Sequence, residues 1–224
     1  GAYRGAGRPE AAAAIERAVD AFAMEIGMDP AEVRRRNFLS PSSFPLVTKT
    51  GSSYDSGEYE ASLDAALTVS KYEELRTEQA KRRLNKETRL LGIGVASYVE
   101  RTAGAGRSEY GGVELLSGGK LRARTGSSPY GQGHQTAWAM LISDATGVNM
   151  EDIEVLHGDT DEIPQGGITG GSRSVQLAGA AIWESSELLV DQAKKVAADL
   201  LEASEEDLSL DTTNGLFHVI GTPS

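Results

Sequence analysis

The sequence predicts an α+β fold in which helices pack on a mixed sheet, preceded by a helical segment. Three observations support this class. Apolar residues recur at helical spacing through most of residues 9–84. Short apolar runs and hairpin turn signals follow from residue 90 onward. The helices and strands of this later part do not alternate as regular βαβ repeats do, which favours α+β order over a wholly parallel sheet.

Two helices are predicted in the first part. Residues 9–26 begin with a proline suited to a first helical turn and stop before a glycine at 27. The apolar residues of this helix share one stripe: Ile15, Val19, Phe22 and Ile26. A second helix runs from Pro30 to Phe38 with Asp29 as its N-cap. The basic run 34–36 is expected to form a solvated face near its C-terminus.

Residues 40–57 are rich in proline, serine and glycine, which predicts a loop and the best internal boundary. Residues 58–84 return to helical periodicity with a charged end. We therefore expect two parts, residues 1–57 and residues 58–224.

The later elements follow from periodicity and turn chemistry. The apolar run Leu90–Val99 is expected to be a buried strand. Strands over 111–116 and 121–125 flank SGGK, and a closing hairpin surrounds Asn214-Gly215. Helices are predicted over 135–148 and 172–201, with a strand over 153–157 and a glycine-rich loop over 158–171 between them. The stripe of the last helix comprises Val175, Ile182, Leu189, Val196 and Leu200.

Composition excludes several functions. The chain of 224 residues is 39% hydrophobic and 25% charged, as expected of a globular protein. Its net charge of −11 argues against non-specific nucleic-acid binding, which requires a basic face. The absence of cysteine excludes an iron–sulfur cluster ligated by these residues. No apolar run reaches the roughly 20 residues that span a bilayer.

Three glycine-rich loops each run into a predicted helix. They are Tyr3–Pro9, Tyr130–His134 and Thr169–Ser174. A helix start offers free N–H groups and a partial positive charge, while glycine lets a ligand touch the backbone. Arginines at 4, 8 and 173 add charge suited to phosphate or another oxyanion. Each loop taken alone is also explained as a turn with a helix cap, and together they leave a phosphate-rich ligand and simple turns equally open.

No catalytic or metal-binding pattern is legible. The three histidines, His134, His157 and His218, lack metal-ligand spacing, and structural roles account for them. Acidic pairs are explained by solvated loops and helix starts. We therefore predict no metal ligand and no catalytic residue among these residues.

Six ordered segments resemble the xanthine dehydrogenase/aldehyde oxidase/carbon monoxide dehydrogenase family of molybdenum hydroxylases, and within it the carbon monoxide dehydrogenase large chains. They cover essentially the whole chain: AYRGAGRPE, DPAEVRRRNFL, YDSGEYEASLDAAL, SPYGQGHQT, EVLHGDTDEIP and GGSRSVQLAGAA. The resemblance implies a fragment of the subunit that binds the molybdenum cofactor, with 1–57 ending one cofactor-binding half and 58–224 forming a second, truncated half.

The resemblance also implies which residues bind molybdopterin, expected in its cytosine dinucleotide form. The first loop contributes Arg4, Gly5 and Ala6. The second contributes Gly131, Gln132, Gly133 and His134. The third contributes Gly171, Ser172, Arg173 and Ser174. Ala6 stands where purine-oxidising relatives carry an aromatic residue, which argues against a xanthine-like substrate. Tyr98 and Tyr130 could line a pocket, although a core position explains Tyr98 equally well.

Two departures limit the analogy. Copper-containing relatives hold copper through a cysteine in the first loop, where this chain has Gly5-Ala6. The family's general-base glutamate belongs to a motif that these residues lack, so we expect the isolated fragment to be inactive. The resemblance further implies a cytoplasmic enzyme that hydroxylates a small substrate with water as oxygen source. The rest of the large subunit, a medium subunit with FAD and a small iron–sulfur subunit would be its partners.

Two other functions stay open from the residues alone. The glycine loops suit a non-redox module that holds a nucleotide-like or phosphorylated ligand. The alanine-rich helix over 9–26 suits an assembly or interaction domain.

Overall fold

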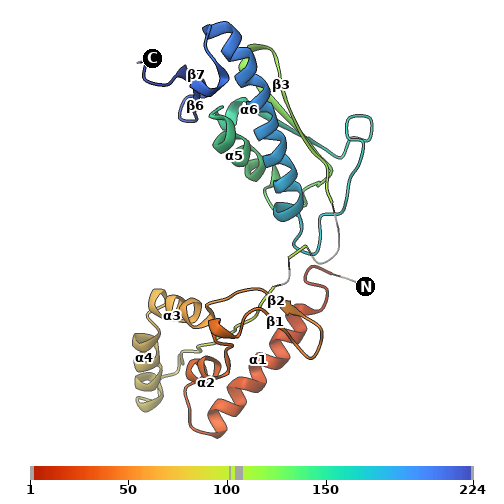
Figure 1. Ribbon diagram of the computed structural model, residues 1–224. Helices are drawn as coiled ribbons and strands as arrows, with labels where there is room; N and C mark the ends of the chain where they lie inside the picture. Colours follow the sequence, from red (N-terminus) through yellow and green to blue (C-terminus); the bar gives the residue numbers. More distant parts are fainter. Residues whose placement is uncertain (1–2, 101, 104–107, 223–224) are drawn as a thin grey trace. The chain divides into compact units, whose positions relative to one another are not determined.

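The computed structural model describes residues 3–100, 102–103 and 108–222 (Figure 1). The chain divides into two compact units, one up to Val99 and one from Glu100 onward. The boundary expected at 57/58 does not coincide with this division. The helices over 59–84 contact the preceding helices of the first unit, which places them with residues before 57. The assignment of two cofactor-binding halves stays a prediction.

The first unit is mainly helical. Its elements are α1 (Arg8–Glu25), α2 (Pro30–Asn37), η1 (Pro41–Ser43), β1 (Leu46–Val47), β2 (Ser53–Tyr54), α3 (Tyr59–Val69) and α4 (Tyr72–Leu84). Both predicted helices of this region are confirmed, and Asp29 caps α2 by accepting from the backbone nitrogens of Ala31 and Glu32. Within the predicted loop, β1 and β2 form a short antiparallel pair.

The helical pattern predicted over 58–84 is confirmed as two helices, because the chain breaks between α3 and α4. Lys71 adopts a left-handed backbone conformation with φ of 53°. The hydroxyl of Ser70 donates to the carbonyl oxygen of Leu67, a local bond that competes with helix continuation. The break turns the chain so that Tyr72, the first residue of α4, is buried.

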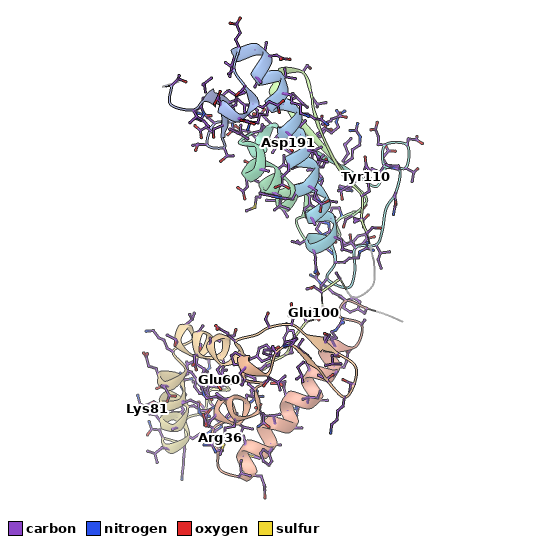
Figure 2. All side chains as sticks on the ribbon, viewed as in Figure 1. Arg36, Glu60, Lys81, Glu100, Tyr110 and Asp191 are labelled. Carbon is purple, nitrogen blue, oxygen red and sulfur yellow. The ribbon has the colours of Figure 1, made fainter. Side chains whose placement is uncertain are left out.

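The solvated face expected for the basic run is wrong for Arg34. Its side chain is buried, and its guanidinium lies 2.8 Å from Glu16 and 2.9 Å from Asp20 on α1. Burial lowers the pKa of Arg34, but the hydrogen bonds with the two carboxylates outweigh it and raise the pKa. Arg36, labelled in Figure 2, does lie exposed and pairs with Glu32 on its own helix.

The face of α1 that contacts Arg34 is therefore polar, and it is not the apolar stripe from which the helix was predicted. Glu16 and Asp20 pair with Arg34 of α2 and Ala23 is buried, whereas Ile15 and Phe22 are 62% and 55% exposed. Apolar spacing predicted the helix correctly, and the ion pairs with Arg34 involve a neighbouring face of it.

Leu90–Val99 forms no strand, although its burial alternates as in one. Side chains take the place of a neighbouring strand for its backbone. Gln79 donates to the carbonyl oxygen of Leu91 at 3.0 Å, and the N–H of Ser97 donates to Glu16 at 2.9 Å. Tyr98 is exposed, so the core position considered for it is also wrong.

Asp29 also joins α2 to α4. The hydroxyl of Tyr72 donates to its carboxylate at 3.0 Å, and the Arg76 guanidinium lies 3.3 Å away. Burial, together with this hydrogen bond, raises the pKa of Tyr72 to about 12. The phenol is therefore held neutral in the folded chain well above the pH at which a solvated tyrosine ionises.

We expect this tyrosine to make stability fall at high pH. An unfolded tyrosine ionises near pH 10, so between about pH 10 and pH 12 the unfolded state releases a proton that the folded state retains. Unfolding becomes easier through this window, by on the order of 2 kcal/mol. Urea unfolding near pH 9 and near pH 11.5 should show a smaller loss for Tyr72→Phe than for wild type. The exposed Tyr98→Phe is the control, and equal losses in both variants would contradict the prediction.

The second unit is a three-stranded sheet covered on one face by two helices (Figure 1). Its main elements are β3 (Gly111–Leu115), η2 (Ser117–Gly119), β4 (Leu121–Thr125), α5 (His134–Thr146), η3 (Met150–Asp152), β5 (Ile153–His157), η4 (Ser174–Gly179) and α6 (Ala180–Leu201). β3 and β4 are antiparallel, β4 and β5 are parallel, and the predicted mixed sheet is confirmed. η5 (Glu205–Asp207), β6 (Leu208–Asp211) and β7 (Leu216–Val219) complete the unit with the predicted closing hairpin.

The core of this unit lies between β4 and the two helices. Leu121, Ala123, Ile142 and Ile182 are buried against one another. The stripe expected for the last helix is only partly correct. Ile182 and Leu189 pack on this core, whereas Val175, Val196 and Leu200 are exposed. The described helix starts with a π-helical turn, η4, so a single α-helical stripe does not extend over its whole predicted length.

Alternate residues of β4 point to the other face of the sheet, where charges replace apolar contacts. Arg124 pairs with Glu114 at 2.7 Å and Glu162 at 2.8 Å, while Arg122 lies 2.8 Å from Glu154. Hydrogen bonds to its two carboxylates raise the pKa of Arg124. This outer face is thus a cross-strand ion-pair network. Among the described residues, no helix has the length and apolar character needed to cross a membrane.

Candidate functional site

The strand order brings the two later glycine loops to one edge of the sheet. β4 leads into residues 126–133 before α5, and β5 leads into residues 158–173 before η4. Because β4 and β5 are parallel neighbours, both loops leave from the carboxyl ends of adjacent strands. Gly111 of β3 pairs with Thr125, so the residues just before β3 reach the same edge. Ligands of sheets with parallel strands commonly bind at this edge.

Hydroxyl groups join the two loops directly. The Ser127 side chain is buried, and its oxygen lies 3.0 Å from that of Thr169 and 2.8 Å from that of Ser174. The Thr169 hydroxyl also donates to the carbonyl oxygen of Ser128 at 2.5 Å. The second and third predicted loops therefore lie together in the second unit.

The start of α5 leaves its backbone amides available. Gly131 and Gly133 have φ of 101° and 75°, and Gly133 is the N-cap residue. No side chain among the described residues caps this helix, in contrast to α2, whose first amides bind Asp29. Gln132 is exposed, and its side-chain oxygen accepts from the N–H of Tyr130 at 2.5 Å. The loop thus presents free N–H groups that suit an anion.

His134, the first residue of α5, is buried. Its ring packs on Trp138 with centroids 5.3 Å apart. Neither Nδ1 of His134 nor Nε1 of Trp138 finds a hydrogen-bond partner in the described part of the chain. Buried polar atoms are rarely left unpaired, so two such nitrogens beside the free amides fit a site completed by a bound polar group.

The third loop turns sharply through left-handed residues. Gly171 and Ser172 have φ of 64° and 53°, and the Ser172 hydroxyl donates to Glu100 at 2.9 Å. The proposed role of Arg173 with phosphate suggested a side chain that extends from the loop. The side chain does not extend in this way. Its guanidinium is buried, lies 3.3 Å from Glu109 and donates to the carbonyl oxygen of Ser108 at 2.7 Å. Direct contact of Arg173 with a cofactor stays a prediction.

The first loop belongs to the first unit. Gly5, Ala6 and Gly7 all have positive φ, and the N–H of Arg8 donates to the carbonyl oxygen of Gly5 at 2.9 Å. A side chain at Gly5 would meet the Pro9 ring at 2.7 Å, which explains glycine there. Arg4 is exposed. Its convergence with the loops of the second unit stays a prediction.

Sequence reasoning missed the residues that hold the site together. Ser127 and Glu109 act through partners more than 40 residues away, and no local motif marks them. Residues of the kind that ligate metals do not gather in groups of three or more within the described ranges.

Comparison with known proteins agrees with this geometry. An α+β unit with two glycine-rich helix starts at one sheet edge defines a class of anion- or cofactor-binding domains. A molybdopterin cofactor-binding domain model matches residues 65–222, and a second model of the same description matches residues 1–38. The chain belongs to the molybdopterin cofactor-binding domain family, which confirms the resemblance seen in the six segments.

Individual relatives agree with the family. The chain is 40% identical to the carbon monoxide dehydrogenase large chain of Hydrogenophaga pseudoflava, over 89% of this chain and 26% of that protein. It is 35% identical to the 6-hydroxypseudooxynicotine dehydrogenase complex subunit gamma of Paenarthrobacter nicotinovorans, over 99% of this chain and 28% of that protein.

Solved structures show the same fold. CO dehydrogenase from Oligotropha carboxidovorans superposes with a TM-score of 0.79 at 34% identity, over 96% of this chain and 28% of that chain. Quinoline 2-oxidoreductase from Pseudomonas putida 86 gives a TM-score of 0.81 at 29% identity, over 98% and 29%. The chain therefore spans less than a third of the length of these relatives.

Proposed function

We propose that this chain forms part of the molybdopterin-binding site in the large subunit of a molybdenum hydroxylase, an oxidoreductase that hydroxylates a small substrate with water as oxygen source. One observation carries the proposal. The loops 127–134 and 169–174 are joined by the Ser127 hydroxyl at the carboxyl edge of the sheet, beside the uncapped start of α5. Membership in the cofactor-binding family gives the ligand that such a site would hold.

The residues present suit the polar parts of this cofactor. The free amides at the start of α5 and the turn at Gly171–Ser172 can donate to oxyanions, and glycine permits close approach. His134 and Trp138 offer buried nitrogens that lack partners within the described residues. When bound, the cofactor would supply the molybdenum and the electron-accepting chemistry. The chain's own role is to bind and orient the group.

The remaining assignments follow from the same proposal. Arg4, Gly5 and Ala6 would complete the site from the first unit, and the cofactor would be the cytosine dinucleotide form. The general base, the remaining cofactor loops and the electron carriers would belong to the rest of the large subunit, an FAD subunit and an iron–sulfur subunit, in a cytoplasmic complex. The isolated chain would therefore turn over no substrate. Gly5-Ala6 would leave no thiolate for copper in the first loop.

A matched pair of glycines tests the proposal. Gly133 and Gly118 have similar backbone conformations, with φ of 75° and 79°, and a methyl group at either would meet no atom within 4 Å. Alanine should strain each by a similar amount, about 1 kcal/mol. In the full-length subunit within its complex, we expect Gly133→Ala to lower molybdenum content at least about fivefold, because the added methyl group stands where the cofactor approaches. Gly118→Ala in the β3–β4 turn should leave it unchanged.

Molybdenum per subunit, measured by elemental analysis alongside the melting temperature, decides the outcome. Wild-type complex without molybdenum would refute the proposed function. Equal losses in both glycine variants would instead attribute the effect to general strain and remove the α5 start from the site.

A further inference from the structure

A buried ion pair lies behind the third loop and is not explained by the fold alone. The Arg173 guanidinium and the Glu109 carboxylate are 3.3 Å apart, with side chains only 7% and 2% exposed. Glu109 also accepts from the N–H of Gly167 at 3.0 Å and from its neighbour Tyr110 at 3.1 Å. Glu109, two residues before β3, is thereby tied to both the start and the end of the loop over 166–173.

Two glycines enclose this pair. A side chain at Gly167 would meet the Glu109 carboxylate at 2.5 Å and the Arg173 guanidinium at 2.6 Å. A side chain at Gly126 would collide with the Glu109 carboxylate and with the backbone of Gly166. The backbone of both glycine loops therefore closes directly on the carboxylate, which excludes water and fixes the path of each loop around one charged group.

We propose that Glu109 is a positioning residue for cofactor binding: it holds Arg173 inside the domain so that the loop presents the Ser172–Ser174 turn, rather than the guanidinium, to the cofactor. This inference rests on the proposed function. Its physical basis is that the charges of Arg173 and Glu109 neutralise each other. An arginine whose charge is paired with a buried carboxylate adds no net charge at the site, and Arg173 is fastened further by the carbonyl oxygen of Ser108.

Removal of one partner should be far more damaging than removal of both. Glu109→Gln leaves the Arg173 charge buried without a counter-charge, and Arg173→Met leaves the Glu109 charge in the same state. Either remaining charge draws water or moves outward, which displaces the loop. The double variant Glu109→Gln with Arg173→Met leaves no buried charge, and neutral replacement of a buried ion pair is commonly tolerated.

The experiment compares these three variants in the full-length subunit within its complex. Molybdenum and organic phosphate per subunit are measured after gel filtration, with the melting temperature of each preparation. We expect the molybdenum and organic phosphate contents of each single variant to fall at least about tenfold, because one buried charge is left without a partner. The contents of the double variant should recover to within about threefold of wild type, because it has no unpaired buried charge. Glu114→Gln, which removes a carboxylate from the outer face of the same sheet, should retain wild-type content.

The pattern of rescue separates positioning from direct binding. If Arg173 binds the cofactor itself, the double variant will be as depleted as Arg173→Met, and the inference is overturned. Full content in Glu109→Gln overturns it as well. If a single variant fails to assemble, the molybdenum content of the double variant decides the outcome. A double variant without molybdenum counts against the inference, whether or not it assembles. Absence of molybdenum from wild type would instead reject the proposed function.

Discussion

Replacing Trp138 with alanine is expected to lower the free energy of unfolding of the second unit by about 3–5 kcal/mol, the cost typical of deleting a buried aromatic ring. Trp138 is completely buried, packs on the His134 ring and lies against Gly179, where an added methyl group would approach its ring to 3.3 Å. The cavity would lie between α5 and η4, directly behind the two loops of the candidate site. Loss of cofactor should therefore accompany the loss of stability.

The chain's other tryptophan provides the control. Trp183 on α6 is 37% exposed, so Trp183→Ala removes less buried surface and should cost clearly less than Trp138→Ala. Urea unfolding followed by circular dichroism avoids dependence on the fluorophore that each variant removes. A Trp138→Ala variant destabilised by no more than Trp183→Ala would show that this ring does not hold the helices together.

Replacing Arg34 with alanine should destabilise the first unit by about 3 kcal/mol or more, because it breaks a buried ion pair from one side. Among the described residues, Glu16 would keep its charge at a largely buried position with the N–H of Ser97 as its remaining donor, and the ion pair between Arg34 and Asp20 would be lost. The guanidinium also donates to the carbonyl oxygens of Pro30 and Glu16, so α1 and α2 would lose several bonds at once.

Arg36 lies two residues away on the same helix and gives the matched comparison. It is exposed and pairs with Glu32 within α2, so Arg36→Ala should change stability by about 0.5 kcal/mol at most. Hydrogen exchange at the amides of α1 and α2 reports on this unit separately from the second. Equal protection in the two variants would mean that the buried ion pair does not join these helices.

The sequence predicted most helices and strands because their signals are local. Pro30 after Asp29 started α2, SGGK separated β3 from β4, and Asn214-Gly215 marked the last turn. The glycine loops at 131–133 and 171–174 were also recognised, since a glycine before a helix start is visible in the chain itself. The resemblance of the chain to one family then followed from six ordered segments, and the family model confirms it.

The incorrect structural predictions share a cause: a partner distant in sequence decided which structure or packing the segment adopts. Leu90–Val99 has the apolar character of a strand, but Gln79 and Glu16 bind its backbone in place of a neighbouring strand. The apolar stripe of α1 predicted the helix, yet Arg34 binds acidic residues on a neighbouring face. Periodicity identifies an element and its faces; it does not identify which face meets another element.

By itself, the sequence determined the order of most elements, the glycine-rich helix starts and the family, because backbone geometry and turn chemistry depend on neighbouring residues. Only the tertiary structure decided that the second and third loops meet through Ser127, and that Arg173 faces Glu109 rather than solvent. The charge and hydrogen-bonding capacity of a side chain can be read from the chain. Whether that capacity is used within the fold depends on which distant groups the fold brings within reach.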